Sequence, residues 1–90
     1  MRVELLQYEG CPLAPAALRL VRECLGALGV SESVLVRVGD YPSPTVLVNG
    51  ADVMGAAAEP PTARVCRLDV PTRERMLVAV RAALAIESHD

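Results

Sequence analysis

Aromatic side chains are almost missing from this chain, which has two tyrosines but neither phenylalanine nor tryptophan. Hydrophobic residues still make up 52% of the 90 positions, so an apolar core has to be built from Val, Leu and Ala. A disordered chain would be poorer in these residues. Because independent domains usually need about 50 to 200 residues, we expect a single domain that covers residues 1–90.

Lysine is absent, and all nine basic residues are arginines, against eleven acidic residues. This bias, together with the high Ala and Val content, indicates a bacterial coding sequence rich in G and C. The net charge is −2, and no stretch combines basic with aromatic residues, so a nucleic-acid-binding surface has no electrostatic or stacking basis. We therefore expect no nucleic-acid partner.

Long apolar runs are also missing, since none approaches the roughly 18 residues that a membrane span requires. The chain opens with Glu4 where a secretory signal would carry positive charge, so we expect no membrane contact and a cytoplasmic location. Three cysteines are too few, and odd in number, for a secreted disulfide scaffold. A single histidine argues against a zinc site within the chain.

Three segments at the start of the chain predict a parallel strand-helix-strand unit. Arg2–Tyr8 and Val34–Val38 are short apolar-rich runs that are typical of strands. Ala14–Leu28 carries apolar residues at helical spacing, with Pro15 in its first turn and Gly29 at its end. Because the two strands are joined by a helix, we expect them to be parallel.

A β-hairpin is predicted next, because Asn49-Gly50 separates the apolar runs Thr45–Val48 and Ala51–Met54 and suits a type I′ turn. This turn pairs the strands so that Gly55 lies opposite Pro44.

The predicted order of elements is β-α-β-β-β-α. Residues 56–70 have no clear period and form an insert before the last helix, which is expected to begin at Pro71. Only the short loop Gly39–Ser43 connects the second and third strands.

Cys11 is the residue with the most chemical promise, because it stands where the first strand ends and the first helix begins. Unpaired N–H groups and the positive end of the helix dipole favour a thiolate, which lowers the pKa of the thiol and raises its reactivity. The alternative is a buried free cysteine that behaves as a small hydrophobic side chain. The position at the junction favours the reactive interpretation.

Two segments, by their order and separation, resemble the thioredoxin-like superfamily, and the chain is most similar to a glutaredoxin-sized member. Cys11-Pro12 follows a strand, at the place of the family's nucleophilic cysteine. Pro44–Gly50, followed by Val53 and Gly55, is similar to the segment that begins with the family's cis-proline and runs through its last hairpin. Some small bacterial proteins of this kind, with Ser-Pro-Thr at the cis-proline, carry an alkylmercury lyase label.

The resemblance implies an α/β, thioredoxin-like fold whose four-stranded mixed sheet has the order second, first, third, fourth strand. The helix that would follow the second strand is reduced to a loop. The resemblance also implies a cis Ser43–Pro44 bond beside Cys11, with the backbone of Ser43 free to pair with an extended substrate.

The function implied is thiol–disulfide redox chemistry or thiol transfer by Cys11, with Pro12, Ser43 and Pro44 shaping the site. The expected partner is a thiol or disulfide substrate, either a small molecule or a protein. No cofactor is expected, and glutathione is the candidate co-substrate. Whether the chain is itself an oxidoreductase stays open.

The cysteines depart from the family pattern. Ala14 stands where a C-x-x-C pair would place its second cysteine, so Cys11 is predicted to act as a monothiol. Cys24, on the same helix, is expected in the core. Cys66 is either a resolving thiol, a second ligand with Cys11 for a soft metal such as Hg(II), or a packed side chain. A soft-metal or organomercurial-binding protein and a non-catalytic binding module therefore remain alternatives to the redox function.

The shortened loop leaves one face of the predicted sheet without a helix to cover it. Alternation places Glu4, Leu6 and Arg37 on this face, with Glu4 and Arg37 able to pair. We expect the face to be half-solvated, or covered by the insert or by a second copy in a homodimer.

Four further residues have two interpretations each. Tyr8 and Tyr41 could line the thiol pocket, or they could pack as ordinary aromatic side chains. Asp40 and Asp52 could assist proton transfer near Cys11, although surface carboxylates in turns are more common.

Overall fold

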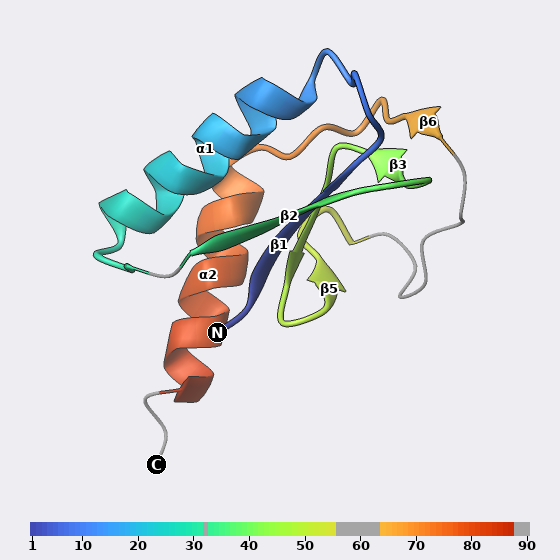
Figure 1. The fold of residues 1–90 in the computed structure, drawn as a ribbon. Helices are drawn as coiled ribbons and strands as arrows, with labels where there is room; N and C mark the ends of the chain where they lie inside the picture. The colour runs from blue at the N-terminus through green and yellow to red at the C-terminus, as the bar shows by residue number, and fades with distance from the viewer. Residues whose placement is uncertain (32, 56–63, 88–90) are drawn as a thin grey trace.

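The chain folds into six strands and two helices within the residues that the computed structural model describes, which are 1–31, 33–55 and 64–87 (Figure 1). In chain order the elements are β1 (Val3–Gln7), α1 (Ala14–Ala27), β2 (Val34–Val38), β3 (Pro42–Ser43), β4 (Thr45–Val48), β5 (Ala51–Asp52), β6 (Val65–Cys66) and α2 (Arg73–Glu87).

Four of the strands form a mixed sheet in the order β2-β1-β4-β5. The strands β1 and β2 are parallel and are connected by α1, whereas β4 is antiparallel to both β1 and β5. The short strands β3 and β6 pair in parallel as a separate ladder. The expectation of an α/β chain with a four-stranded mixed sheet is therefore confirmed.

The helix α1 begins at Ala14, three residues after Cys11, and ends beside the glycine that its sequence predicts as the stop. Leu13 precedes the first helical residue and provides no side-chain cap. At the other end, Gly29 has a φ of 69° and donates to the carbonyl of Gly26, while the N–H of Val30 reaches the carbonyl of Leu25. These two bonds form the Schellman motif that glycine favours at a helix end.

The hairpin between β4 and β5 has the predicted turn, with positive φ at Asn49 (51°) and Gly50 (83°). The strand β5 ends at Asp52, two residues earlier than expected. The Asp52 carboxylate accepts a hydrogen bond from the N–H of Met54, and the N–H of Gly55 turns back to the carbonyl of Asp52. This aspartate turn ends the strand, so Gly55 does not continue the hairpin toward Pro44.

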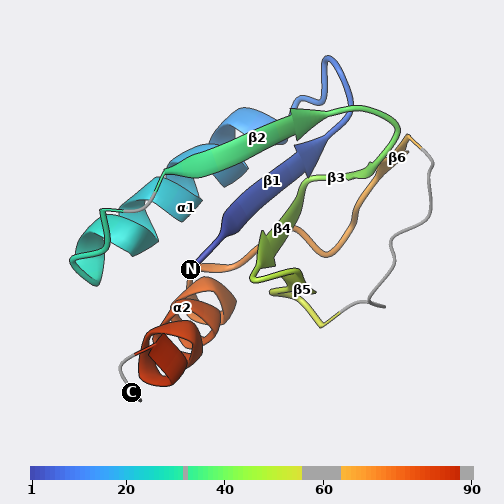
Figure 2. The same cartoon turned by 60° about the horizontal axis from the view of Figure 1, so that its bottom comes forward.

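Both helices pack on one face of the sheet, where the core lies (Figures 1 and 2). The centre of this core consists of aliphatic side chains and one methionine that are at most 5% exposed, namely Val3, Leu5, Val21, Val46, Val48, Met76 and Val80. Cys24 belongs to the same cluster, as expected. An aliphatic core of this kind needs no large aromatic side chain.

The opposite face of the sheet is half-covered within the single chain. On β1, Leu6 and Glu4 are buried, whereas Leu35 and Arg37 on β2 are exposed. The Arg37 guanidinium lies 4.0 Å from the Glu4 carboxylate, which is the pair expected from their neighbouring strands.

The end of the chain differs from the sequence prediction in two ways. The helix α2 begins at Arg73 and not at Pro71, because the Thr72 hydroxyl accepts a hydrogen bond from the N–H of Arg75 and so caps the first turn. The insert contains the strand β6, which its composition did not predict; residues 56–63 of the insert lie outside the described residues.

Neither described helix is long and apolar enough to cross a membrane.

Candidate active site around Cys11

Cys11 lies in the turn between β1 and α1. Its N–H donates to the carbonyl of Tyr8, and its own carbonyl accepts from the N–H of Ala14, so the backbone holds the side chain at the start of the helix. The residue is 5% exposed, whereas Pro12 beside it is exposed. Pro12 has no N–H, so its backbone donates no hydrogen bond near the thiol.

Ser43 and Pro44 approach Cys11 from the other side of the site. The peptide bond between them is cis, as the resemblance implies. The side chain of Ser43 is fully buried, yet its hydroxyl makes no hydrogen bond to any other described residue. The hydroxyl lies against the Cys11 thiol and is the donor that a thiolate there would use. A buried hydroxyl without a partner is costly unless it serves such a purpose.

The surroundings of Cys11 favour its thiolate. Burial on its own would raise the pKa of Cys11, but the Ser43 hydroxyl, the N–H groups of Leu13 and Ala14, and the Tyr8 hydroxyl together lower this pKa below its usual value. All four groups are hydrogen-bond donors, and donors stabilise the charged form of a thiol. Both N–H groups belong to the start of α1, where the first backbone donors have no partner within the helix, and the N–H of Ala14 also donates to the Cys11 carbonyl.

Cys66 lies next to this site on β6. Ser43 and Cys66 are directly paired in the parallel ladder between β3 and β6, and the N–H of Arg67 donates to the carbonyl of Ser43 at 2.9 Å. The expectation that the Ser43 backbone is free for an extended substrate is therefore wrong. The chain's own insert occupies that edge, because β6 supplies the hydrogen bonds that a substrate strand would have made.

Tyr8 lies beside Cys11, whose N–H donates to the Tyr8 carbonyl. Burial raises the pKa of the Tyr8 phenol, and the neighbouring Cys11 and Cys66 thiols raise it further. The phenol therefore stays protonated near neutral pH. Of the two interpretations for Tyr8, the structure supports the one in which it lines the thiol pocket.

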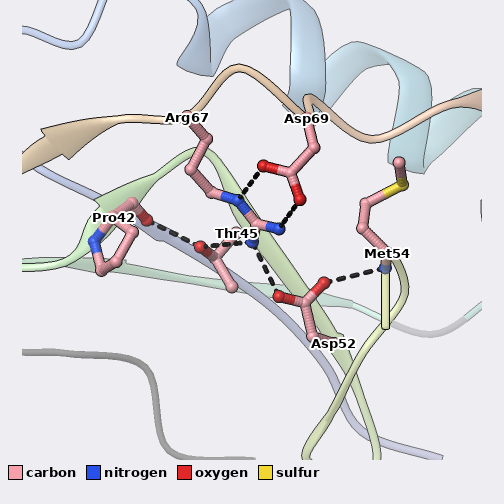
Figure 3. A network of polar contacts seen from close by, with 6 residues as sticks. All are labelled: Pro42, Thr45, Asp52, Met54, Arg67 and Asp69. Carbon is pink, nitrogen blue, oxygen red and sulfur yellow. Dashed lines mark hydrogen bonds and ion pairs between the residues drawn. The ribbon is translucent and has the colours of Figure 1, made fainter. Parts of the chain in front are cut away.

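Arg67 anchors β6 to the rest of the chain (Figure 3). Its guanidinium donates to Asp52 at 2.7 Å, to the Thr45 hydroxyl at 2.9 Å, and to both carboxylate oxygens of Asp69 at 2.6 and 3.0 Å. The side chains of Arg67 and Asp52 are 8% and 5% exposed. Thr45 in turn donates to the carbonyl of Pro42, so one cation ties β3, β4, β5 and β6 together.

Charge pairing also shifts the titration of this cluster. The hydrogen bonds to Asp69 are the largest reason why the pKa of Arg67 is raised, and the same bonds hold the pKa of Asp69 below its usual value. The sequence pattern did not predict this cluster. An arginine and an aspartate two residues apart, at the spacing that places side chains on one face of an extended segment, were the available signal.

The other candidate residues are placed away from the thiol chemistry. Asp52 is bound by Arg67, and the exposed Asp40 pairs with Arg64 at 2.7 Å, so both carboxylates serve to attach the segment around β6. The Arg37 guanidinium lies over the Tyr41 ring, with its central carbon 5.8 Å from the centre of that ring. Burial is the main reason why the pKa of Cys24 is raised, which fits an unreactive core thiol.

Two surface depressions adjoin the site. One, of about 370 Å³, is open and includes Gln7, Gly10, Cys11, Leu18 and Val36 in its lining. The other, of about 180 Å³, is mostly apolar and lies between the start of α1, Pro44 and the segment before α2.

Across the described ranges, no three His, Cys, Asp or Glu side chains gather in a way that could hold a metal ion. All three cysteines are free thiols. No protein-family model matches the chain, and no curated protein or solved structure shows significant similarity to it. The chemistry of the site is therefore interpreted from its own residues.

Proposed function

We propose that this chain is a thioredoxin-like thiol–disulfide exchange protein in which Cys11 is the nucleophile. The β2-β1-β4-β5 order and the crossover helix behind Cys11 support this fold assignment. The observation that carries the function is the fully buried Ser43 hydroxyl, which makes no hydrogen bond to any other described residue and lowers the pKa of the Cys11 thiol. A side chain of this kind is explained if the working state of Cys11 is a thiolate.

The chemistry begins with the Cys11 thiolate, which attacks one sulfur of a disulfide substrate. A bond forms between Cys11 and that sulfur, the substrate's own disulfide bond breaks, and the other half leaves as a thiolate that takes up a proton. Donors at Ser43, Leu13 and Ala14 stabilise the thiolate before attack. A low-molecular-weight thiol such as glutathione, attacking the mixed disulfide, returns Cys11 to its reduced form.

The test is the rate of alkylation of Cys11 as a function of pH, measured in a Cys66→Ser variant so that the exposed second thiol does not contribute. The expected midpoint lies below the value of about 8.5 for an unperturbed thiol. A midpoint at or above that value contradicts the proposal. The matched control is the Cys11→Ser, Cys66→Ser double variant, in which only the buried Cys24 remains and labelling should be very slow.

Activity is measured as glutathione-dependent reduction of a small disulfide. Wild-type protein is expected to turn over, and the Cys11→Ser variant is expected to lose turnover completely. If wild-type protein and the Cys11→Ser variant reduced the disulfide at equal rates, the redox function would be refuted and the chain would be a non-catalytic binding module.

A second candidate function is soft-metal binding by Cys11 and Cys66, and the pairing of Cys66 with Ser43, which lowers the pKa of Cys11, favours it. Two thiolates suffice for a linear Hg(II) complex, which does not need a third ligand. Titration with Hg(II) distinguishes the candidates: loss of tight binding in the Cys66→Ser variant supports a two-thiol site, and unchanged affinity excludes it.

A further inference from the structure

We propose that Cys66 is the resolving thiol of Cys11, held in place by the chain's own β6 strand at the edge where a substrate strand would otherwise pair. This inference rests on the proposed function of Cys11 and adds a second chemical step to it. It also changes the prediction of monothiol chemistry, because the partner that Ala14 fails to provide comes from the insert.

The register of the β3–β6 ladder places Cys66 on the correct side of the sheet. Residues that pair directly across a ladder project to the same face, and neighbouring strands are about 4.8 Å apart. Cys66 pairs with Ser43, whose hydroxyl lies against the Cys11 sulfur. The Cys66 side chain therefore projects to the same side of the ladder as the Ser43 hydroxyl, which lowers the pKa of Cys11.

The attachment of Cys66 is much stronger than a two-residue strand would provide alone. The next residue, Arg67, donates its N–H to Ser43 and its guanidinium to Asp52, Thr45 and Asp69. Its side chain is only 8% exposed, whereas Cys66 itself is exposed. Arg67 is thus a positioning residue, and the thiol that it positions remains accessible for reaction.

The Cys66 thiolate attacks the Cys11 sulfur of the mixed disulfide, a Cys11–Cys66 bond forms, and the bond from Cys11 to the substrate sulfur breaks. The substrate half leaves as a thiolate and takes up the proton that Cys66 gave to solvent. The protein loses two electrons and two protons, and the substrate disulfide gains both. A low-molecular-weight thiol then reduces the Cys11–Cys66 bond.

The experiment treats reduced protein with one equivalent of dipyridyl disulfide and follows release of the coloured pyridinethione. Wild-type protein is expected to release two equivalents, and its intact mass should fall by two hydrogen atoms. Tryptic digestion should yield one linked pair of peptides that contain Cys11 and Cys66. The Cys66→Ser variant should release one equivalent and keep a stable pyridyl adduct on Cys11.

Three outcomes would overturn the inference. One is a wild-type protein that keeps the same stable adduct on Cys11 as the Cys66→Ser variant. Another is a second phase whose rate rises with protein concentration, since resolution within one chain is independent of concentration. The third is loss of the second phase in a Cys24→Ala control, which should behave as wild type because Cys24 is fully buried in the core.

Failure of this inference and failure of the proposed function give different results. If Cys11 is not a nucleophile, the Cys66→Ser variant releases pyridinethione no faster than an unperturbed thiol. If only the resolving step is wrong, that variant still reacts rapidly and wild type behaves in the same way. Because Cys66 is exposed, its replacement by serine is not expected to disturb folding.

Discussion

Replacement of Arg67 by methionine is the most informative single perturbation of this structure. The change removes the cation from beside Asp52, whose side chain is 5% exposed, while it keeps a long aliphatic side chain in place. Removing one partner of a buried ion pair typically costs about 3–5 kcal/mol, because the other charge stays buried and unpaired. Asp52 keeps its hydrogen bond from Met54, so we expect the lower end, about 3 kcal/mol.

This loss is large for a domain of this size. At about 0.05–0.15 kcal/mol per residue, a chain of this length has a total stability on the order of 5–14 kcal/mol. A loss of 3 kcal/mol corresponds to a fall in melting temperature of about 12–24 °C, since 1 kcal/mol shifts a small domain by about 4–8 °C. The Arg67→Met variant should therefore be folded at room temperature and melt early.

The assay is urea unfolding followed by far-UV circular dichroism, because the chain has no tryptophan to report by fluorescence. Asp69→Asn is the matched control: its side chain is 54% exposed, so its pair with Arg67 is worth about 1 kcal/mol or less. The Arg67→Met, Asp52→Asn double variant should recover part of the loss, because the buried charge is gone. Equal costs for Arg67→Met and Asp69→Asn, or no recovery in the double variant, would refute the reasoning.

Three further predictions concern the thiol site and the hairpin. Ser43→Ala should raise the pKa of Cys11, since it removes a donor to the thiolate, and alkylation of Cys11 at neutral pH should slow; an unchanged pH midpoint would contradict the role of the hydroxyl. The lowered pKa of Cys11 stabilises the folded state above the unfolded thiol's pKa of about 8.5, and this contribution disappears as the pH falls through the folded value. Cys11→Ser should therefore cost more stability at alkaline than at acidic pH, as measured by urea unfolding, and a pH-independent cost would argue against it. Gly50→Ala should lower stability by about 1 kcal/mol or more, because an alanine at a φ of 83° is strained; a neutral effect would contradict the assigned turn.

The sequence predicted local elements well wherever local chemistry decides them. Pro15 in the first turn and Gly29 at the end bounded α1, and Asn49-Gly50 set the turn and register of the hairpin. The position of Cys11 before α1 followed from the same signals. These features depend on dihedral preferences and side-chain spacing within a few residues, which a single sequence contains.

Predictions failed where a distant side chain competes with local preference. The strand β6 has only two residues, and it exists because Arg67 reaches Asp52 and Thr45 across the chain. Hydropathy and turn propensity contain no information about these contacts. The early end of β5 has a local cause instead, because the Asp52 side chain accepts the N–H of Met54, two residues further on.

What the sequence by itself determined is the order of the two helices and of the four strands of the main sheet, the aliphatic core and the placement of Cys11 at a helix N-terminus; it did not predict the short strands β3, within the expected loop Gly39–Ser43, and β6. Hydrophobic periodicity and backbone dihedral preferences act over short distances along the chain, so they can be recognised without a structure. The family resemblance already implied that Ser43 lies beside Cys11, but only the tertiary structure decided that Cys66 pairs with Ser43 and that Arg67 binds Asp52 and Thr45. These contacts join segments that are at least 15 residues apart in the chain. The buried Arg67 side chain binds Thr45 and Asp52, and so holds β6 against the edge formed by β3.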